Sequence, residues 1–413
     1  MYLFTALSAA AAVGSMVYFK KNEDKHNERL KSLDVNVHVN GIRGKSTVTR
    51  MVGGVFRAAG LNTIAKTTGT YACVIDAAGN EHPIQRFGNP NIQEQYQIIE
   101  RWVQPEIQAL VVECMAVKPE YQAICQDVII KSPISIITNV RLDHQEELGQ
   151  TLPEIARSLC RTVPQEGVLI TGETNPELCA VMEEECRKRN AKLIIANADN
   201  EAQALVPSFD YLQFSENVAI VFALSDYLGI PRDIAVRGML SAAPDPGTTR
   251  LTHLHMSMNT DLIWIPMFAV NDKESSIKIF HDLVESKLPA GCKKVIALNN
   301  RSDRTDRANL FLDILNIELA GQFDRVVLYG DLQEIAYSKL IDGGLPAPMI
   351  RTAHGLDVND GASLINLNLQ EFAGETVAVF GMGNIHTPEV VAMQRYIDAI
   401  VAAFKYGNKV GVL

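Results

Sequence analysis

The feature that most constrains the fold is a glycine-rich turn between a short alternating segment and a helical pattern. Residues 39–47 read Val-Asn-Gly-Ile-Arg-Gly-Lys-Ser-Thr, between a strand-like run at 35–39 and helical spacing over 45–59. In this arrangement the backbone N–H groups of the turn and the helix N-terminus converge on an anion. The spacing Gly-x-x-Gly-Lys-Ser therefore predicts a phosphate-binding loop, shorter than the common GxxxxGK[ST] loop.

Each part of this loop has an expected task. Lys45 would reach the β- and γ-phosphates of a nucleotide, and Ser46 would hold Mg²⁺. Arg43 either binds phosphate or is solvated. The alternative is a surface turn with incidental glycines, which the order of strand, loop and helix disfavours. The expected phosphate contacts come from Asn40, Gly41, Ile42, Arg43, Gly44, Lys45, Ser46 and Thr47.

Strand-like and helical segments alternate along the rest of the chain. The first half has strand-like runs at 35–39, 109–113, 134–139, 168–171 and 193–196, and helical patterns at 216–228 and 231–240. The second half has strand-like runs at 262–265, 294–298, 325–329 and 376–380, separated by helical stretches near 273–287, 305–320 and 388–404. This alternation predicts α/β domains with mostly parallel sheets covered on both faces. The Pro- and Gly-rich residues 242–249 place a domain boundary near Arg250.

Length and composition limit the function classes. A chain of 413 residues, 47% hydrophobic and 21% charged, suits two or three folded domains. The net charge of −10 argues against nucleic-acid binding as the main task. The seven cysteines form no Cys-x-x-Cys pair, which is typical of reduced, buried thiols in a cytoplasmic protein rather than a disulfide framework or a zinc site.

The N-terminal segment predicts a membrane anchor. Residues 2–19 carry no charge, and Lys20 and Lys21 follow immediately. Eighteen uncharged residues are just enough for a span, and the basic residues after them place the C-terminal side in the cytoplasm. An amphipathic or buried helix is the alternative. We therefore expect residues 1–34 to form an anchor and a juxtamembrane linker.

Further polar residues follow the predicted strands. Glu113 ends the strand at 109–113, and residues 137–144 read Ile-Thr-Asn-Val-Arg-Leu-Asp-His. Ligands bind at the carboxyl ends of strands in open α/β sheets. Glu113, His144 and Ser46 are therefore the candidate Mg²⁺ ligands. Mg²⁺ prefers oxygen ligands, so the imidazole of His144 is a less usual ligand, and the alternative is an ordinary core or surface histidine.

These motifs, in this order, resemble those of the Mur ligases and folylpolyglutamate synthases. The resemblance covers about residues 35–275 and rests on the GxxGKS loop, the acid-ended strand, the TNxxxDH motif, the helix carrying Asn217, and the segments around Arg250 and Asp272. It implies a Mur-ligase-like ATP-binding central domain at 35–250 and a smaller Rossmann-like domain at 251–413. It also implies that Asn217 contacts adenine, Arg250 phosphate and Asp272 ribose, with ATP and Mg²⁺ as cofactors.

Three departures from the pattern of these enzymes restrict which members of the group the chain resembles. Only about 34 residues precede the first strand, where Mur ligases carry a UDP-binding domain, so a UDP-muramoyl substrate is disfavoured. Residues 157–161 (Arg-Ser-Leu-Cys-Arg) lack the lysine that many family members carbamylate, so a second metal is held differently or is absent. The apolar N-terminus is not expected of a cytosolic folate enzyme. With the glycine turn at 381–384, these features resemble the capsule protein B family, the ligase subunits of poly-γ-glutamate synthase.

The expected function is an ATP-dependent amide ligase that polymerises glutamate through γ-carboxyl linkages by way of an acyl phosphate. Lys45, Glu113 and His144 are the expected catalytic residues. The expected partners are glutamate, the growing poly-γ-glutamate chain and integral membrane synthase or export subunits, with self-association left open. The resemblance implies a cell-membrane location with the catalytic domains in the cytoplasm. Two alternatives remain: a folylpolyglutamate synthase-like ligase, and a non-catalytic nucleotide-binding subunit of a polymer exporter.

Overall fold

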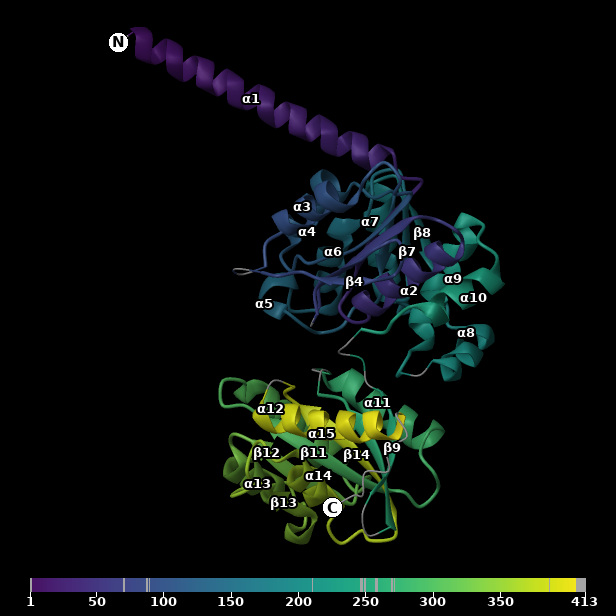
Figure 1. Cartoon of the computed structure of the whole chain (residues 1–413), viewed down its shortest axis with the longest axis vertical. Coiled ribbons are helices and arrows are strands. Elements are labelled where there is room, and N and C mark those ends of the chain that lie inside the picture. Colours follow the sequence, from purple (N-terminus) through teal and green to yellow (C-terminus); the bar gives the residue numbers. More distant parts are fainter. Residues whose placement is uncertain are drawn as a thin grey trace. The chain divides into compact units, whose positions relative to one another are not determined.

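The chain divides into two compact units in a computed structural model (Figure 1). Unit 1 comprises Met1–Phe209 and Gln213–Gly247, and unit 2 comprises Asp210–Leu212 and Thr248–Leu413. The structure describes residues 2–405 apart from residues 70, 87, 89, 210, 246, 247, 249, 257, 258, 269, 271 and 386, and the side chains of residues 2–13, 286, 404 and 405 are outside the description.

The described residues of unit 1 form an eight-stranded sheet in the order β4-β3-β2-β5-β1-β6-β7-β8. All neighbours from β2 to β8 are parallel, and β3 and β4 extend one edge as antiparallel strands. The strands are β1 (Val35–Asn40), β2 (Thr63–Thr67), β3 (Cys73–Ile75), β4 (Glu81–Pro83), β5 (Ala109–Glu113), β6 (Ile134–Ile137), β7 (Val168–Thr171) and β8 (Lys192–Ile195).

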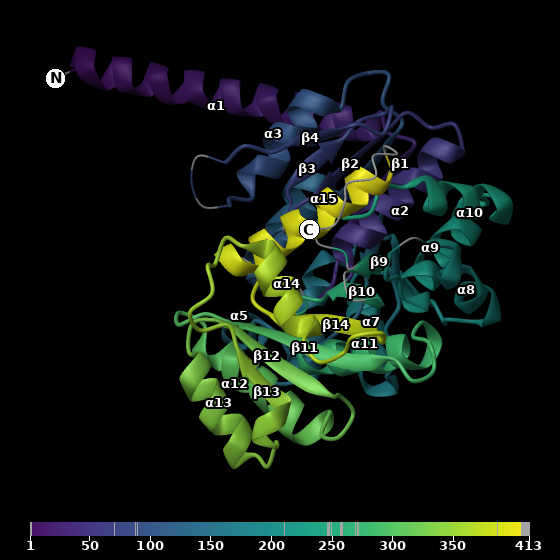
Figure 2. The same cartoon turned by 60° about the horizontal axis from the view of Figure 1, so that its bottom comes forward.

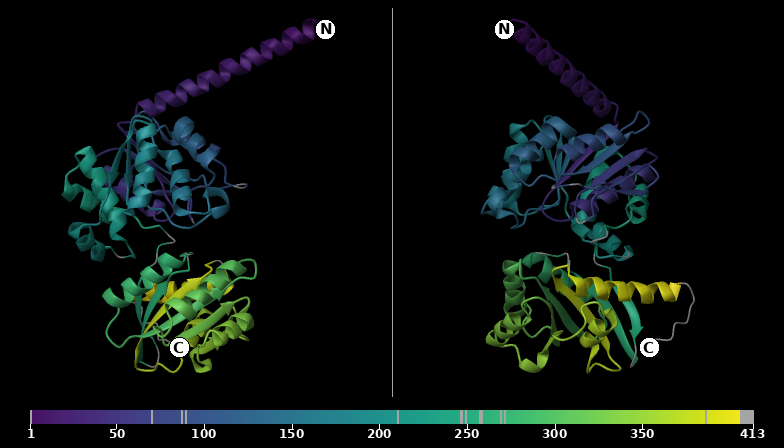
Figure 3. Two further views of the ribbon diagram at one scale, coloured as in Figure 1. Left: turned by 180° about the vertical axis from the view of Figure 1, so that it is seen from behind. Right: turned by 60° about the vertical axis from the view of Figure 1, so that its left-hand side comes forward.

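Helices cover both faces of this sheet (Figures 1 and 3). The helices of unit 1 are α1 (Tyr2–Lys31), α2 (Lys45–Ala58), α3 (Gln93–Trp102), α4 (Pro119–Ile124) with a π-helical continuation (Cys125–Ile130), α5 (Gln145–Leu148), α6 (Leu152–Leu159), α7 (Pro176–Lys188), α8 (Asn200–Leu205), α9 (Ser215–Leu228) and α10 (Arg232–Ser241). Most of α1 projects away from the sheet in Figure 1.

Strand β5 shows how the sheet separates its two faces. Leu110 and Val112 belong to an apolar cluster with Ile98 and Ile99 of α3. Successive side chains of a strand point to opposite faces, so Glu113 points to the other face, where it contacts the start of α2. Helix α2 buries Val48, Met51, Val52 and Val55, a helical spacing that seats it on the sheet. The carboxylate and the loop therefore meet on one face.

Unit 2 is a second α/β layer structure with a six-stranded sheet in the order β13-β12-β11-β14-β10-β9. Its strands are parallel except for β9, which pairs antiparallel with β10. In Figure 2, α14 and α15 lie side by side over this sheet. The elements are β9 (Thr252–Met256), β10 (Thr260–Pro266), α11 (Lys273–Ser286), β11 (Lys293–Asn300), α12 (Thr305–Asp313), β12 (Arg325–Gly330), α13 (Gln333–Asp342), β13 (Ile350–Thr352), α14 (Gly361–Leu369), β14 (Thr376–Gly383) and α15 (Pro388–Lys405).

The predicted parallel α/β arrangement is confirmed, with small shifts at the element ends. The helix expected over 305–320 is α12 followed by a π-helical turn at Ile314–Glu318. All seven cysteines are free and buried, as the sequence predicts. Burial raises the pKa of the Cys114 thiol to about 11, which keeps it protonated at neutral pH.

Helix α1 is longer than the expected anchor, because residues 22–31 continue it without a break. Its C-terminal part packs on unit 1: His26 is buried, stacks on Tyr96 at 4.4 Å between ring centroids, and its Nε2 lies 2.6 Å from the carbonyl oxygen of Ile129. Within the residues that are described, no helix is long and apolar enough to cross a membrane. Residues 2–13 of the predicted anchor lie outside the described side chains.

Candidate active site

The phosphate-type loop lies between β1 and α2 and depends on two glycines. Gly41 has φ +120°, and a Cβ there would lie 2.1 Å from the hydroxyl oxygen of Thr138. Gly44 has φ +82°, and a Cβ there would lie 2.6 Å from Oδ1 of Asn217. Both positions combine a left-handed backbone with no room for a side chain, so only glycine fits without strain. The loop thus has the tight backbone path that a phosphate cradle requires.

The segment after β6 holds the loop in place. Asn139 Oδ1 accepts a hydrogen bond from the Arg43 backbone N–H at 3.0 Å, and Asn139 Nδ2 donates to the Arg43 carbonyl oxygen at 3.1 Å. The Thr138 hydroxyl also donates to that carbonyl oxygen, at 2.6 Å. The Thr and Asn of the TNxxxDH motif therefore act as a brace for the loop, which fixes its backbone before any ligand binds.

Lys45 is folded back over the loop. Its ammonium donates to the carbonyl oxygens of Gly41 at 2.8 Å and of Ile42 at 3.1 Å. Burial lowers its pKa, and the nearby Glu113 carboxylate opposes that shift. A cation held by neutral carbonyl groups can turn towards a stronger anionic partner, so Lys45 is placed to engage phosphate oxygens. Thr47 follows it in the first turn of α2 and is half-buried.

Ser46 and Glu113 form the one direct contact between predicted metal ligands in the described residues. The Ser46 hydroxyl donates to Glu113 Oε2 at 2.9 Å, and the Thr68 backbone N–H donates to the same oxygen at 2.8 Å. Parallel pairing aligns Val39 with Glu113, which brings the end of β5 beside the loop. Glu113 is buried, and burial raises its pKa, although Lys45 opposes the shift. A divalent cation would offset the cost of its buried charge.

The donor set fits Mg²⁺ rather than a fully protein-bound metal. One carboxylate and one hydroxyl leave most positions for water and substrate phosphates, as Mg²⁺ commonly requires. Among the residues the structure describes, no group of three or more His, Cys, Asp or Glu side chains could hold a metal ion. A Mg²⁺ ion held by Ser46 and Glu113 would take its other ligands from water and phosphate oxygens.

His144 is placed apart from the Ser46–Glu113 contact. It precedes α5 with φ +47°, its side chain is half-exposed, and its Nε2 lies 4.0 Å from Asp143 Oδ1. Asp143 also pairs with Arg43, whose Nη2 lies 3.2 Å from Asp143 Oδ2. The Arg43 side chain is thus tied to the Asp-His segment in this conformation. A metal role for His144 stays a prediction.

Asn40 and Asn217 are two buried asparagines that lie next to the loop in sequence and in space, respectively. The buried Asn40 amide donates to Gln122 Oε1 at 2.8 Å, so its side chain points into the unit rather than towards the phosphate cradle. Any contact of Asn40 with a nucleotide would use its backbone. Asn217, buried on α9, donates to Gln213 Oε1 at 3.1 Å and lies against Gly44. Its predicted adenine contact would therefore come from directly beside the loop.

Arg250 and Asp272 belong to unit 2. Arg250 is exposed in an irregular segment before β9. Asp272 caps α11, accepting a hydrogen bond from the Ser275 N–H at 2.8 Å. Their assignments to phosphate and ribose stay predictions.

The sequence interpretation missed a buried charged cluster next to Glu113. Lys66, fully buried on β2, lies 2.9 Å from Glu94 Oε1, and Arg86 Nε lies 2.6 Å from Glu94 Oε2. Lys66 also opposes the rise in the Glu113 pKa. The available signal was a single charged residue in a short β-branched segment, Thr-Ile-Ala-Lys-Thr at 63–67.

Two stretches of the chain match models of known protein families. Residues 39–239 match the Mur ligase middle domain, and residues 251–399 match the poly-gamma-glutamate synthase CapB C-terminal domain. The chain is 34% identical over 364 residues to the capsule biosynthesis protein CapB of Bacillus anthracis, covering 87% of this chain and 76% of that protein. It is 34% identical over 365 residues to the PGA synthase CapB of Bacillus subtilis (strain 168), covering 88% and 90%.

A solved structure shares the fold. The folylpolyglutamate synthase of Mycobacterium tuberculosis, complexed with ADP, superposes with a TM-score of 0.61 at 16% identity, covering 93% of this chain and 94% of that one. That likeness extends the fold assignment over both units, and the match to the CapB C-terminal domain separates this chain from the folate enzymes. The chain belongs to the CapB family of poly-γ-glutamate synthases, within the Mur ligase superfamily.

Proposed function

We propose that this chain is the ATP-dependent ligase that extends poly-γ-glutamate for a capsule or a secreted polymer. Membership of the CapB family makes it an amide ligase of the Mur type. The observation that carries the proposal at the site is the Ser46–Glu113 contact at 2.9 Å beside a glycine-bounded loop with Lys45. Those groups match what a Mg²⁺–nucleotide needs from a protein.

The reaction has two steps. An oxygen of the γ-carboxylate at the end of the chain attacks the γ-phosphorus of ATP, which forms an acyl phosphate and releases ADP. The amine of an incoming glutamate then attacks the acyl carbon, losing a proton as the amide forms and inorganic phosphate leaves. The protein mainly has to position these groups and stabilise the charge on the transferring phosphoryl group.

The residues of unit 1 divide these tasks. Lys45 would leave the carbonyl oxygens of Gly41 and Ile42 and bind the β- and γ-phosphates. Ser46 and Glu113 would hold Mg²⁺, which neutralises charge on the phosphates when it is bound. The Glu113 carboxylate is already held in place by Thr68 N–H. His144 would approach the same region from the segment after β6, and its exposed side chain is free to reorient.

The remaining nucleotide contacts are part of the proposal. Asn217 would contact adenine, Arg250 a phosphate and Asp272 the ribose. Asn217 lies against the loop residue Gly44, which supports its role. The support for Arg250 and Asp272 is their position in the family motif order. We also propose the division of the chain into residues 1–34, 35–250 and 251–413.

The N-terminal helix supports a membrane location. Residues 2–19 are uncharged and Lys20 and Lys21 follow them. In the described part of α1, the apolar side chains Met16, Val17, Tyr18 and Phe19 are all exposed, by 50–71%, so no face of that turn is covered by the protein. Consecutive exposed apolar residues suit a lipid environment better than water. We propose an anchor that keeps the ligase at the cytoplasmic side of the membrane, next to integral subunits that accept the polymer.

The decisive experiment measures ATP-dependent incorporation of labelled D- or L-glutamate by membranes that contain this chain. Glutamate-dependent ADP release and a product cleaved only by γ-glutamyl hydrolysis are the expected results. ADP release that needs a pterin acceptor would favour a folate-type ligase. Nucleotide binding without glutamate-dependent ADP release, in the presence of the membrane partners, would leave only a scaffold role.

A further inference from the structure

Unit 1 has an arginine-lined hollow at the end of α2 opposite the phosphate-type loop. It has a volume of about 500 Å³ and lies between α2, the turn after β3 and the end of α10. Arg50, Arg57 and Arg237 line it, and none of the described lining residues is acidic. Its remaining walls are small or apolar: Ala58, Ile75, Ala77, Ala78, Gly79, Ser241, Ala242 and Ala243.

Arg50 and Arg57 differ in how their charges are compensated. Arg50 is buried and already paired, with Nη1 2.5 Å from Glu81 Oε1 and Nε 3.7 Å from Asp245 Oδ2. Arg57 has no such partner in the described part of the chain: its Nη1 is buried and makes no hydrogen bond. Leaving a buried cationic donor unpaired costs free energy. The residue with this unpaired group, Arg57, lines an open hollow.

Neighbouring groups do not compensate the positive charge of Arg57. Burial lowers its pKa, and the nearby Arg50 adds to that effect. Asp76 is the one acid that opposes the shift, but its carboxylate accepts hydrogen bonds from the Asn80 N–H at 2.8 Å and lies 2.8 Å from His82 Nε2. Arg57 also lies against two glycines, because a Cβ on Gly53 would be 3.4 Å from its Nη2 and one on Gly79 would be 3.9 Å from its Nε. An anionic ligand is the missing partner.

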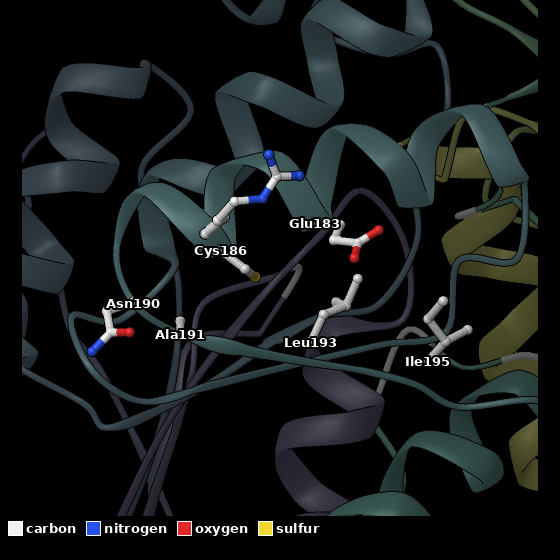
Figure 4. A pocket seen from close by; sticks show the side chains of 7 residues that line it. Glu183, Cys186, Asn190, Ala191, Leu193 and Ile195 are labelled. Carbon is white, nitrogen blue, oxygen red and sulfur yellow. The ribbon is translucent and has the colours of Figure 1, made fainter.

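A second hollow in unit 1 provides a contrast (Figure 4). It measures about 560 Å³ and lies between α7 and β8. Its lining holds one arginine, Arg187, and one carboxylate, Glu183, so the charges of the lining balance. The two hollows are similar in volume, and the excess of guanidinium groups is specific to the first.

We propose that the hollow of Arg57 and Arg237 is a second, oligocarboxylate-binding site that takes γ-linked glutamyl segments of the polymer, separate from the nucleotide site. This inference rests on the proposed function for the identity of its ligand. A guanidinium pairs bidentately with a carboxylate. The alanines between the arginines match the methylene groups between carboxylates in a γ-glutamyl chain, and the volume exceeds that of a single phosphate.

The test is calorimetric titration of the full-length protein in detergent with γ-linked tri-glutamate. The uncharged probe is the same γ-linked trimer with its carboxylates converted to carboxamides (γ-linked isoglutamine units), and pyrophosphate is the phosphate probe. We expect tri-glutamate to bind, and Arg57→Gln and Arg237→Gln each to weaken it about tenfold or more, the value of one charge-assisted pair. The matched control, Arg187→Gln, should leave the affinity unchanged. Equal weakening by all three variants, or tighter binding of pyrophosphate than of tri-glutamate, would overturn the proposal.

Two further measurements separate this site from the nucleotide site and from a structural role. Tri-glutamate should still bind to Lys45→Ala, and loss of binding there would place the probe at the phosphate-type loop. The Tm of ligand-free Arg57→Met should be equal to or above that of the wild type, because an uncompensated cation is removed. A lower Tm would assign Arg57 to the fold instead. Binding of tri-glutamate by a protein that ligates no glutamate would reject the proposed function and leave this site standing.

Discussion

The ammonium group of Lys45 carries the first residue-scale prediction. It is held by the carbonyl oxygens of Gly41 and Ile42, and its stem belongs to α2. Lys45→Ala removes the charge without touching the buried face of α2. We expect ATP-dependent glutamate ligation to fall by about 100-fold or more, as for removal of one charge-stabilising donor, with an unchanged circular dichroism spectrum. The matched control is Lys45→Arg, which keeps the positive charge but changes the shape of the group that carries it. Full ligation activity of Lys45→Ala would contradict the assignment of the nucleotide site to this loop.

The Glu113 carboxylate predicts an unusual dependence of stability on pH. Burial raises its pKa in the folded protein above the ordinary 4.5. A carboxyl with a raised pKa stabilises the fold fully below the unfolded pKa, and this contribution is lost as pH rises through the folded pKa. In metal-free protein, Glu113→Gln should therefore gain Tm relative to the wild type as pH rises from 4.5 towards 8. The amide oxygen can still accept the hydrogen bonds from Ser46 and Thr68.

Added Mg²⁺ and ADP supply the control for Glu113. They should raise the Tm of the wild type and leave that of Glu113→Gln nearly unchanged, since the variant lacks the anionic ligand. A pH-independent Tm difference between the two proteins would contradict a raised pKa. An equal rise in Tm of both proteins on addition of Mg²⁺ and ADP would show that Glu113 is not a metal ligand.

Residue alternation explains which site residues the sequence could predict. In β1, Val35, Val37 and Val39 share one face, and Asn36, His38 and Asn40 share the other. That polar face is buried and makes hydrogen bonds to the segment after β5, where Gln126 Oε1 accepts a hydrogen bond from the His38 Nδ1–H at 2.8 Å. The period of two places Asn40 on this polar face, away from α2, and the expected phosphate contact of Asn40 did not take this placement into account. What the sequence did not indicate is that polar partners would cover that face.

At the scale of elements, helices α2 and α10 cross at two glycines. A Cβ on Gly54 would lie 2.3 Å from the Gly238 carbonyl oxygen, and one on Gly238 would lie 2.4 Å from the Val55 Cα atom. Gly238→Ala should therefore cost about 1–3 kcal/mol of stability, the usual range for overpacking, read as a lower midpoint in urea. Gly14→Ala, on α1 with open space around it, is the control and should not destabilise.

Helix α1 supplies a second element-scale prediction through His26. Burial lowers the pKa of this imidazole below its ordinary 6.5. A histidine with a lowered pKa contributes stability that is present above the unfolded pKa and is lost as pH falls through the folded pKa. The contact between α1 and Tyr96 should therefore loosen as pH falls below 6.5. Proteolysis within residues 22–31, measured relative to His26→Gln at each pH, should rise towards acid pH, and a constant ratio would contradict this.

Among the strands, hydrophobic periodicity predicts some elements from the sequence and misses others. Long strands with apolar runs, such as β5 and β14, were assigned correctly because their burial on both faces leaves a clear pattern. Strands β3 and β4 have only three residues each, too few for a period of two to be recognised. Lys66 is the one charged residue of β2, and its partner Glu94 lies 28 positions away in sequence, so the sequence pattern does not predict their pairing.

At the scale of the whole molecule, the anchor that we propose for the N-terminal segment would keep the ligase at the membrane. A ligase whose polymer leaves the cell gains from a fixed position beside the export subunits, since each product then starts next to its exit. The net charge of −10 would repel the protein from an anionic leaflet, so charge alone cannot hold it there. The apolar run at 2–19 and the exposed side chains Met16 to Phe19 offer the alternative attachment.

Deleting residues 1–19 tests that attachment. The truncated chain keeps His26 and its contacts with Tyr96 and Ile129, so unit 1 should fold and bind ATP with unchanged affinity. In cells, the truncated protein should leave the membrane fraction, and surface polymer should fall to a small fraction of the wild-type amount, because ligation is no longer coupled to export. Replacing residues 2–19 with an unrelated apolar span should restore both, since the proposed role requires only attachment. Normal surface polymer from the truncated chain would show that the catalytic units reach the exporter without an anchor.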